Sequence, residues 1–285
     1  MKDLLPDRFT WSRRTAATTA ESWFETLSHL GPMRVMVTQN AGSNSAKVQA
    51  HGLTENEAQS LKKEHGGVIS EATWLTSTNT PQRAPIRVRG KLAIVSTEAE
   101  QQASLQSNGI PALWIPASLA FGTGEHATTA MCLRHLADIA RPLTKKNWSF
   151  LDLGTGSAIL AMAAKLLGSN DILGTDFDAL ALRTAKENLA NNNLENIKLL
   201  RSDVLKWKPT RTWDVVAANL FSGVLIEAAP TITSCLETKG KLLLSGVLRN
   251  QEKEVLRSFE ALGIAFEKVA RRGKWISARG IRANS

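Results

Sequence analysis

The chain has 285 residues, of which 43% are hydrophobic and 21% charged, and its formal net charge is +9. At roughly 150 residues per domain, this length and composition predict about two soluble domains and exclude both a disordered chain and a small disulfide-stapled module. Cys132 and Cys235 are the two cysteines, and both occur in apolar stretches. We therefore expect neither a disulfide framework nor a cysteine zinc site. Because the first residues lack the apolar run of a signal peptide, we expect a cytoplasmic protein.

The positive charge gathers toward the C-terminus. Residues 239–285 contain 11 Lys and Arg against 4 Asp and Glu, whereas residues 121–238 contain 12 of each kind. A basic strip favours an acidic partner such as nucleic acid, but it can also serve solubility alone. The chain has eight Trp and no Tyr. Trp could stack on nucleobases, but we expect these scattered residues to fill cores.

The N-terminal 80 residues predict a small α+β domain. Helical patterns cover residues 20–31 and 54–66, and strand patterns cover residues 33–39 and 47–53. Residues 76–85 are rich in Thr and Pro and predict a linker, and the segment after it predicts a β-hairpin. The resulting division is a small domain at residues 1–80, a linker and hairpin at 81–118, and a larger domain at 119–285.

The larger domain alternates strands and helices, which is typical of an α/β fold with a mostly parallel sheet. Five strands are predicted, at residues 149–153, 171–176, 197–203, 213–220 and 240–248. The first helix is expected to have Ser157 as its N-cap and to end at Gly168. A second helix should begin behind Asp178, and a later one should be interrupted or kinked at Pro230. Two strand-like runs within residues 264–280 lack a helix between them, so they must pair as a hairpin.

The strongest local motif is Asp152-x-Gly154-x-Gly156, at the end of the first of these strands. Its glycines allow a tight turn and let a ligand approach the free N–H groups at a helix start. A dinucleotide-binding loop would carry a third glycine where this chain has Ile159. Since S-adenosylmethionine (SAM) carries no phosphate, this departure favours SAM over NAD. Asp152 could accept a hydrogen bond from the amino group of the ligand, directly or through water.

Acidic residues follow the next two strands. Asp176 lies 22 residues after Gly154, where a carboxylate can accept hydrogen bonds from both ribose hydroxyls. Asp203 follows the third strand and is placed to accept from the adenine amino group, although a turn or helix-cap role explains it almost as well.

Two further segments carry a family resemblance. AFGTGEHATTAMCLRHL at residues 120–136 and AANLFSGVL at residues 217–225 resemble the PrmA family, the methyltransferases of ribosomal large-subunit protein L-eleven. Members of that family carry an FGTG-x-H-x-TT box and an N-[IL]-x-x-x-x-L run. The resemblance covers about residues 86–280 and is weak over the first 85. It implies a class I SAM-dependent methyltransferase fold, a Rossmann-like seven-stranded sheet.

The resemblance also implies where SAM would bind. Its cofactor contacts fall on Thr129, Gly154, Asp176 and Asn219. Phe121 and Thr129 lie where they would cover the methionine end of SAM, although Thr129 could be an ordinary helix residue. His126 could be a base, but we favour a hydrogen bond within its loop. The complete set of expected cofactor-binding residues is Phe121, Thr129, Gly154, Gly156, Asp176, Asp203 and Asn219.

Asn219 is the candidate catalytic residue. Its side-chain carbonyl can accept N–H bonds and aim an amine lone pair at the methyl group, and orientation supplies much of the rate of an in-line displacement. A lysine ammonium must first lose a proton, and no residue is an evident base. No spacing of His, Cys or Asp predicts a metal site.

The chain departs from the family pattern at Ala158, where the family usually has Gly. An Ala158→Gly change should leave SAM affinity nearly unchanged. In PrmA-like proteins the N-terminal domain grips the substrate protein, and this part matches weakly here.

Three functions follow from these observations. The leading hypothesis is a SAM-dependent methyltransferase of lysine or N-terminal amino groups of a ribosomal protein, L-eleven by the resemblance. The second is an rRNA methyltransferase that uses the basic C-terminal strip. Against it, Asn219 is followed by Leu-Phe-Ser instead of the Pro-Pro-aromatic run of many nucleobase methyltransferases. The third is a non-catalytic ribosome-associated binding module, which would not need Asp176 or Asn219.

Overall fold

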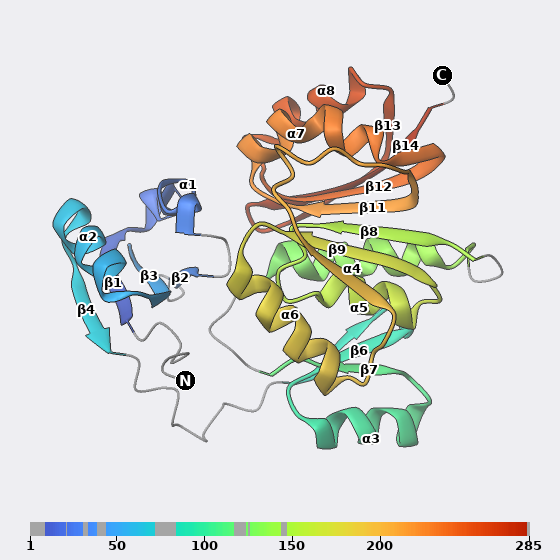
Figure 1. Cartoon of the computed structure of the whole chain (residues 1–285), viewed down its shortest axis with the longest axis horizontal. Coiled ribbons are helices and arrows are strands. Elements are labelled where there is room, and N and C mark those ends of the chain that lie inside the picture. The colour runs from blue at the N-terminus through green and yellow to red at the C-terminus, as the bar shows by residue number, and fades with distance from the viewer. Residues whose placement is uncertain are drawn as a thin grey trace. The chain divides into compact units, whose positions relative to one another are not determined.

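The computed structural model describes residues 9–20, 22–30, 34–38, 44–71, 84–116, 124, 126–143 and 147–283. The chain divides into two compact units, which are described separately here (Figure 1). Described residues 9–71 belong to the smaller unit, and residues 84–116 and 124–283 belong to the larger one.

The smaller unit is an α+β structure. Its strands are β1 (Phe9–Ala16), β2 (Val35–Thr38), β3 (Ser45–Leu53) and β4 (Val68–Glu71), which pair antiparallel in the order β2-β3-β1-β4. Its helices are α1 (Ser22–Thr26) and α2 (Glu55–His65), with 3-10 turns at Ala17–Thr19 and Ser28–Leu30. Helix α2 begins with a capping box, because Thr54 Oγ1 accepts from the Glu57 N–H and Glu57 accepts from the Thr54 N–H. The α+β class predicted for this part is confirmed.

Several details of the smaller unit differ from the sequence prediction. The helix expected over residues 20–31 was wrong in extent, because the chain forms only the short α1 and a 3-10 turn there. Strands β1 and β4 were not predicted. In β1 the side chains of Thr10 and Trp11 are both buried while those of Arg13 and Arg14 are both exposed, so the sequence lacks the alternation that marks a half-buried strand.

The larger unit is built on a seven-stranded sheet. Its strands are β8 (Ser149–Leu153), β9 (Asp171–Asp176), β10 (Ile197–Arg201), β11 (Trp213–Asn219), β12 (Leu236–Leu248), β13 (Ile264–Arg272) and β14 (Trp275–Arg282). Their order is β10-β9-β8-β11-β12-β14-β13. The first five strands are parallel, and β14 runs antiparallel to both β12 and β13. The predicted α/β fold, a mostly parallel sheet closed by a hairpin, is confirmed.

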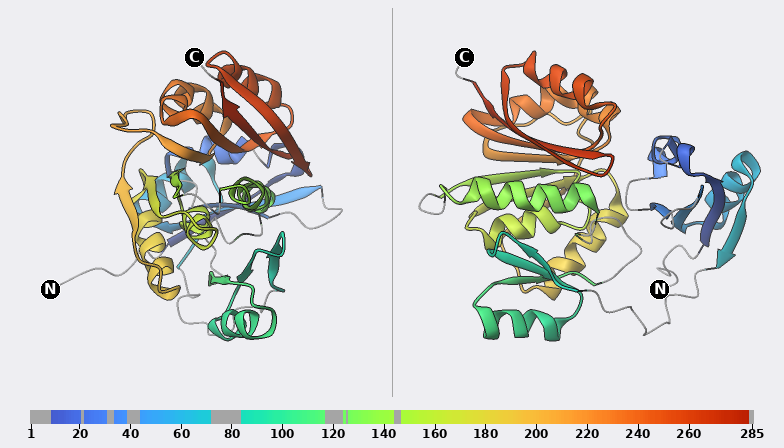
Figure 2. Two further views of the ribbon diagram at one scale, coloured as in Figure 1. Left: turned by 90° about the vertical axis from the view of Figure 1, so that its right-hand side faces the viewer. Right: turned by 180° about the vertical axis from the view of Figure 1, so that it is seen from behind.

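Helices cover both faces of this sheet (Figure 2). They are α4 (Ala127–Ala140), α5 (Ile159–Leu166), α6 (Ala179–Asn191), α7 (Ser222–Ser234) and α8 (Glu252–Glu260). In β8 the side chain of Phe150 packs in the cluster formed with α4 and α5, whereas Leu151 and Leu153 pack in the cluster formed with α7 and α8. At β8 the sheet is therefore apolar on both faces, which explains why apolar residues stand next to one another in this central strand.

Residues 84–116 form a small sheet of their own within the larger unit. Its strands β5 (Ile86–Val88), β6 (Leu92–Val95) and β7 (Ala112–Trp114) lie in the order β5-β6-β7, and α3 (Glu98–Asn108) connects β6 to β7. The antiparallel β5–β6 pair is the predicted hairpin, whereas α3 and β7 were not predicted. Asn192 fastens this segment to the end of α6, because its side chain exchanges hydrogen bonds of 2.7 and 2.8 Å with the backbone of Trp114.

Two helix boundaries bear on the predictions. Ser157 is not the N-cap of α5, since the cap is Ala158 in a left-handed conformation, with φ of 62°. The Ala158 N–H bonds to the Thr155 carbonyl, so the turn closes one residue later than expected. Asp178 caps α6 as predicted, accepting from the Leu180 N–H at 2.9 Å. Helix α7 continues through Pro230 without an interruption in its assigned span.

Acid should destabilise the larger unit through His135. This side chain is 2% exposed on α4, and burial lowers its pKa to about 4, with a further contribution from the charge of Arg279. A folded pKa below the unfolded value of 6.5 stabilises the fold above pH 6.5, and this stability is lost as pH falls toward 4. Between pH 7.5 and 5, we expect His135 to remove about 2 kcal/mol from the free energy of unfolding.

The measurement is urea unfolding at both pH values, followed by far-ultraviolet circular dichroism. Between pH 7.5 and 5, the free energy of unfolding of His135→Gln should fall by about 2 kcal/mol less than that of the wild type. His29→Gln changes an exposed histidine of the smaller unit, and its free energy of unfolding should fall as much as that of the wild type. If the free energy of unfolding fell equally in the wild type and His135→Gln, His135 would not be the cause of the acid destabilisation.

Among the described residues, no helix is long and apolar enough to cross a membrane.

Candidate functional site

The candidate site lies where β8, β9 and β11 end. Strand β8 lies between β9 and β11. The chain leaves β8 toward β9 on one side and returns to β11 on the other, so the strand order reverses beside β8. In open α/β sheets, ligands bind outside the carboxyl ends of the strands at such a switch point. Gly154, Asp176 and Asn219 all lie at this edge, as the sequence predicted.

The glycine loop is tied to its neighbours on both sides. Gly154 and Gly156 have φ values of 69° and 54°, which are left-handed conformations that favour glycine. A Cβ on Gly154 would come within 2.3 Å of Leu220 Cδ2 on the segment that follows β11. On the other side, the Gly156 N–H donates to Asp176 Oδ2 at 2.9 Å. The loop is thus held between the ends of β9 and β11.

Asp176 accepts hydrogen bonds from the backbone of two segments, the glycine loop and the turn before α6. Its Oδ2 accepts from Gly156, and its Oδ1 accepts from the Asp178 N–H at 3.0 Å. The residue is 2% exposed, and burial raises the pKa of its carboxyl group. Each carboxylate oxygen keeps a further lone pair that a ribose hydroxyl can use. Phe177, the next residue, is 46% exposed and adds apolar surface at the same edge.

Asp152 lies deeper than the sequence suggested. It is 1% exposed, and its Oδ2 accepts from Thr155 Oγ1 at 2.7 Å. Burial raises the pKa of Asp152 to about 7, against the opposing effect of the Thr155 hydrogen bond. Its visible role is therefore to hold the loop that carries Gly154 and Gly156. Thr155 was not singled out from the sequence, because its contact depends on how the turn folds back on β8.

Two of the expected cofactor-binding residues carry a buried polar atom that has no hydrogen-bond partner among the described residues. These atoms are Thr129 Oγ1, near the start of α4, and Asn219 Oδ1, at the end of β11. Buried polar groups in proteins are almost always paired, so each such atom needs an explanation. A bound ligand that carries its own donors and acceptors would supply the missing partners.

His126 stands directly before α4. Its Nδ1 lies 2.7 Å from Thr128 Oγ1, and its ring meets that of Trp275 edge-on at 5.0 Å. Burial, together with a smaller effect of the nearby charge of Arg272, lowers the pKa of His126 to about 4. The imidazole is therefore neutral at pH 7. Its hydrogen bond to Thr128 agrees with the expected role within the loop.

Asp203 serves a turn in the structure. Its Oδ1 accepts from the Leu205 N–H at 3.0 Å, and its Oδ2 lies 3.7 Å from Lys206 Nζ. The structure therefore shows the turn role, and contact with adenine stays a prediction. Phe121 lies outside the residues that the structure describes, so its expected contact with SAM also stays a prediction.

Gly246 is a site residue that the sequence analysis missed. It lies in β12 at an irregularity of its pairing with β14, with φ of 85°. A Cβ at this position would come within 2.2 Å of the Leu220 carbonyl oxygen, so glycine is required for the backbone after Asn219 to pass. A glycine inside a predicted strand was the available signal, since such glycines often mark a close backbone approach.

The residues present fit SAM. Asp176 offers acceptor oxygens for ribose hydroxyls, Thr129 offers a hydroxyl without a partner beside a helix start, and Gly154 leaves the loop without a side chain. The described residues contain no group of three or more His, Cys, Asp or Glu that could hold a metal ion.

Ala158 provides a test of how the loop tolerates side chains. It is fully buried, and a left-handed conformation costs a non-glycine residue about 1 kcal/mol. In Ala158→Gly, the relief of this strain is offset by the loss of a buried methyl group, about 0.8 kcal/mol. We expect stability to change by less than about 1 kcal/mol and SAM affinity by less than about twofold.

Ala158→Val is the contrasting variant. A β-branched residue at positive φ in a packed core should cost about 3 kcal/mol or more. Thermal unfolding and calorimetric titration with SAM measure both variants. A large gain in SAM affinity for Ala158→Gly would show that Ala158 impairs binding.

Comparison with known proteins identifies the family. The family model described as ribosomal protein L11 methyltransferase (PrmA) matches residues 16–283. A ribosomal protein L11 methyltransferase of Methylobacillus flagellatus is 37% identical over 187 residues, which span 66% of this chain but only 59% of that protein. One from Pseudomonas fluorescens (strain Pf0-1) is 33% identical over 85% of this chain and 78% of its own length.

A solved structure gives the same result. The crystal structure of ribosomal protein L11 methylase from Lactobacillus delbrueckii subsp. bulgaricus superimposes with a TM-score of 0.59 and 25% identity, over 71% of this chain and all of that one. The family match extends into the smaller unit, where the motifs in the sequence gave little support. The chain belongs to the ribosomal protein L11 methyltransferase (PrmA) family.

Proposed function

We propose that this protein transfers methyl groups from SAM to amino groups of a ribosomal protein, the large-subunit protein L11 that its relatives are named for. The observation that carries the proposal is Asn219 Oδ1, a buried acceptor without a partner at the end of β11. Asn219 lies at the point where the strand order of the sheet reverses. The ends of the neighbouring strands β8 and β9 carry Gly154 and Asp176, which fit SAM. The family match over residues 16–283 supports the same activity.

The cofactor would be held by residues from three segments. Thr129 and the free N–H groups at the start of α4 suit the carboxylate of the methionine portion, and Asp176 suits the ribose. The loop of Gly154 and Gly156, which is bonded to Asp176, would lie against the bound SAM. Asp203 would contact the adenine amino group. When bound, SAM supplies a methyl group on a sulfonium cation.

Asn219 would act on the acceptor amine. Its side-chain oxygen can accept an N–H bond from a neutral amine, which fixes the direction of the nitrogen lone pair. Such orientation accounts for much of the acceleration of a displacement reaction. The amine must arrive deprotonated, and burial in the site lowers the pKa of a lysine ammonium.

The smaller unit would recognise the protein substrate. We propose that residues 1–80 hold the ribosomal protein while residues 119–285 carry out the transfer, in the cytoplasm where ribosomal proteins are made. The segment at 81–118 would join the two parts.

An rRNA acceptor is the second candidate, based on the basic C-terminal strip. In the structure several cations of this strip face acids, since Arg271 pairs with Glu252, and Lys241 Nζ lies 2.8 Å from Glu267 Oε1. Arg279 lies 3.8 Å from carboxylate oxygens of both Asp138 and Glu267. Because Glu252 and Glu267 are themselves among the four acids of the strip, these pairs leave its excess of cations nearly unchanged, and of the acids named here only Asp138 lies outside it. The basic strip therefore keeps RNA as the second candidate, and the family match favours the ribosomal protein.

The deciding experiment is incubation of the full-length protein with methyl-labelled SAM and dissociated ribosomal subunits. Protein and RNA are then separated, and the labelled component is identified by mass spectrometry. Label on the amino groups of L11 is the expected result. Label on RNA would contradict methylation of L11 and would favour the second candidate, an rRNA methyltransferase. Absence of label, with SAM binding confirmed by calorimetry, would contradict both and would favour a non-catalytic binding module.

A further inference from the structure

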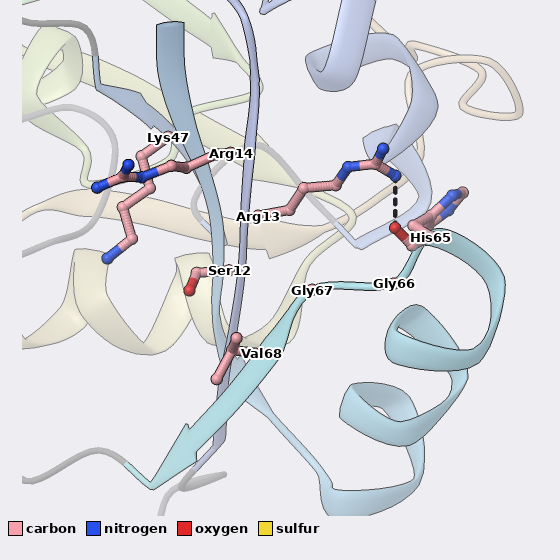
Figure 3. Close-up of a pocket in the computed structure, with 8 residues that line it drawn as sticks. All are labelled: Ser12, Arg13, Arg14, Lys47, His65, Gly66, Gly67 and Val68. Atoms are coloured by element: carbon pink, nitrogen blue, oxygen red, sulfur yellow. Dashed lines mark hydrogen bonds between the residues drawn. The ribbon is translucent and has the colours of Figure 1, made fainter.

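Glycines allow close backbone approaches in both units. In the smaller unit, a Cβ on Gly67 would come within 2.6 Å of the Ser12 carbonyl oxygen, beside the pocket drawn in Figure 3. Gly67 directly precedes β4, which pairs with β1, so this approach belongs to the pairing of two strands. In the larger unit, Gly154 and Gly246 are distant in sequence, yet both meet the same residue, Leu220. Leu220 therefore joins two segments of the candidate site.

The backbone of Leu220 is fixed by β12. Its N–H donates to the Ser245 carbonyl at 3.1 Å, directly after the pairing of Asn219 with Ser245. A Cβ on Gly246 would come within 2.2 Å of the Leu220 carbonyl oxygen, so β12 lies directly against this backbone. Because Asn219 is the preceding residue, a shift of the Leu220 backbone also moves Asn219.

The side chain of Leu220 contacts the glycine loop. A Cβ on Gly154 would come within 2.3 Å of Leu220 Cδ2 and 3.3 Å of its Cγ. Leu220 is half-buried and packs against the apolar cluster formed with α7 and α8. On its other side, the loop is held by the hydrogen bond from the Gly156 N–H to Asp176. The loop that fits the cofactor thus rests on the residue that follows Asn219.

We infer that Leu220 is a positioning residue, whose side chain rests on Gly154 and thereby sets the distance between the cofactor loop and Asn219. This role rests on the proposed function, since it relates the methyl donor to the residue that orients the acceptor amine. Displacement reactions depend steeply on the separation and direction of the reacting groups, and a misplacement of about 1 Å can lower the rate about 100-fold. A leucine side chain holds this distance by packing and adds no polar group that would compete for the amine.

Steady-state kinetics of Leu220→Ala with L11 as acceptor is the first test. We expect kcat to fall at least about tenfold, because Asn219 loses its fixed distance from the cofactor loop. The Gly156–Asp176 hydrogen bond remains, so KM for L11 and the calorimetric affinity for SAM should each change by less than about threefold. Leu220→Met keeps an apolar side chain of similar volume and should retain at least about a third of the wild-type kcat.

The matched control is Leu256→Ala. Leu256 is a half-buried leucine of α8 that packs against the same apolar cluster. Leu256→Ala should therefore lower the stability of the larger unit by a similar amount, while kcat stays within about twofold of the wild type. The comparison separates the position of Leu220 from the general effect of removing an apolar side chain.

Glycine-to-alanine variants test the contact without SAM or an acceptor protein. Gly154→Ala places a methyl group on the Leu220 side chain, so Leu220→Ala in the same chain should relieve the overlap. We expect Gly154→Ala to lower the Tm by at least about 6 °C in the wild type and by less than about half as much in Leu220→Ala. Gly246→Ala is the matched control, because its methyl group meets backbone atoms that remain in Leu220→Ala. It should lower the Tm equally in both backgrounds.

Three outcomes would overturn this role of Leu220. They are a kcat of Leu220→Ala within about twofold of that of Leu256→Ala, a loss of SAM affinity in proportion to kcat, and an equal effect of Gly154→Ala on the Tm in both backgrounds. A wild type that binds SAM but transfers no methyl group would contradict the proposed function itself, and with it the role of Leu220. An active wild type with an equally active Leu220→Ala variant would overturn the role of Leu220 alone.

Discussion

Asp176→Ala is expected to weaken SAM binding by at least about 100-fold. The carboxylate is the acceptor that ribose hydroxyls would use, and hydrogen bonds to a charged group contribute about 1.5–3 kcal/mol each. The change also releases the N–H groups of Gly156 and Asp178 from their shared acceptor, so the loop that carries Gly154 and Gly156 loses its fixed position. A 100-fold loss corresponds to about 2.7 kcal/mol, which two such bonds can supply.

Calorimetric titration with SAM measures this effect. The matched control is Asp171→Ala, at the opposite end of β9, where the carboxylate forms an exposed ion pair with Arg211. This control should bind SAM like the wild type. Asp176→Asn guards against a folding defect, because it keeps the shape of the side chain and one carbonyl acceptor. Binding within threefold of wild type in a folded Asp176→Ala protein would exclude Asp176 from the ribose site.

The parallel sheet was predictable because its signals are local. Strands β8 and β9 coincide with the predicted residues 149–153 and 171–176, since each contains neighbouring apolar residues and ends at a turn residue or a carboxylate. In the smaller unit the signals conflict. Strand β1 carries adjacent buried residues and adjacent exposed arginines, and tertiary pairing with β3 decides its conformation.

Only part of the candidate site could be predicted from the sequence. Residues that end neighbouring parallel strands were predictable, because the chain returns to the same edge of the sheet after each strand and helix. The spacing between Gly154 and Asp176 is set by one helix and one strand, so sequence alone placed them together. The close approach of Gly246 to the Leu220 carbonyl, just after β11, depends on how β12 packs beside β11, and the unpartnered hydroxyl of Thr129 is visible only once α4 is packed. Close contacts between distant backbone segments and the burial of polar atoms arise only when the chain folds, so the sequence alone did not predict them.

Asn219→Ala is expected to lower the turnover number of methyl transfer by at least about 100-fold while SAM affinity changes by less than about threefold. In the proposed mechanism the side-chain oxygen would orient the incoming amine, and loss of an orienting contact made in the transition state lowers kcat. The loss corresponds to about 2.7 kcal/mol of transition-state stabilisation. Steady-state kinetics with L11 as acceptor gives kcat, and calorimetry gives SAM affinity separately.

Two further variants make the result specific to the amide oxygen. Asn219→Asp keeps an acceptor in the same position and should recover part of the turnover. Ser245→Ala changes the residue that pairs with Asn219 on β12, whose hydroxyl donates to the Ile276 carbonyl within the core. It should lower stability and leave kcat nearly unchanged. If Asn219→Ala instead lost SAM affinity and turnover in equal proportion, Asn219 would be a cofactor ligand alone. The orientation of the amine would then have to come from backbone carbonyls at the end of β11.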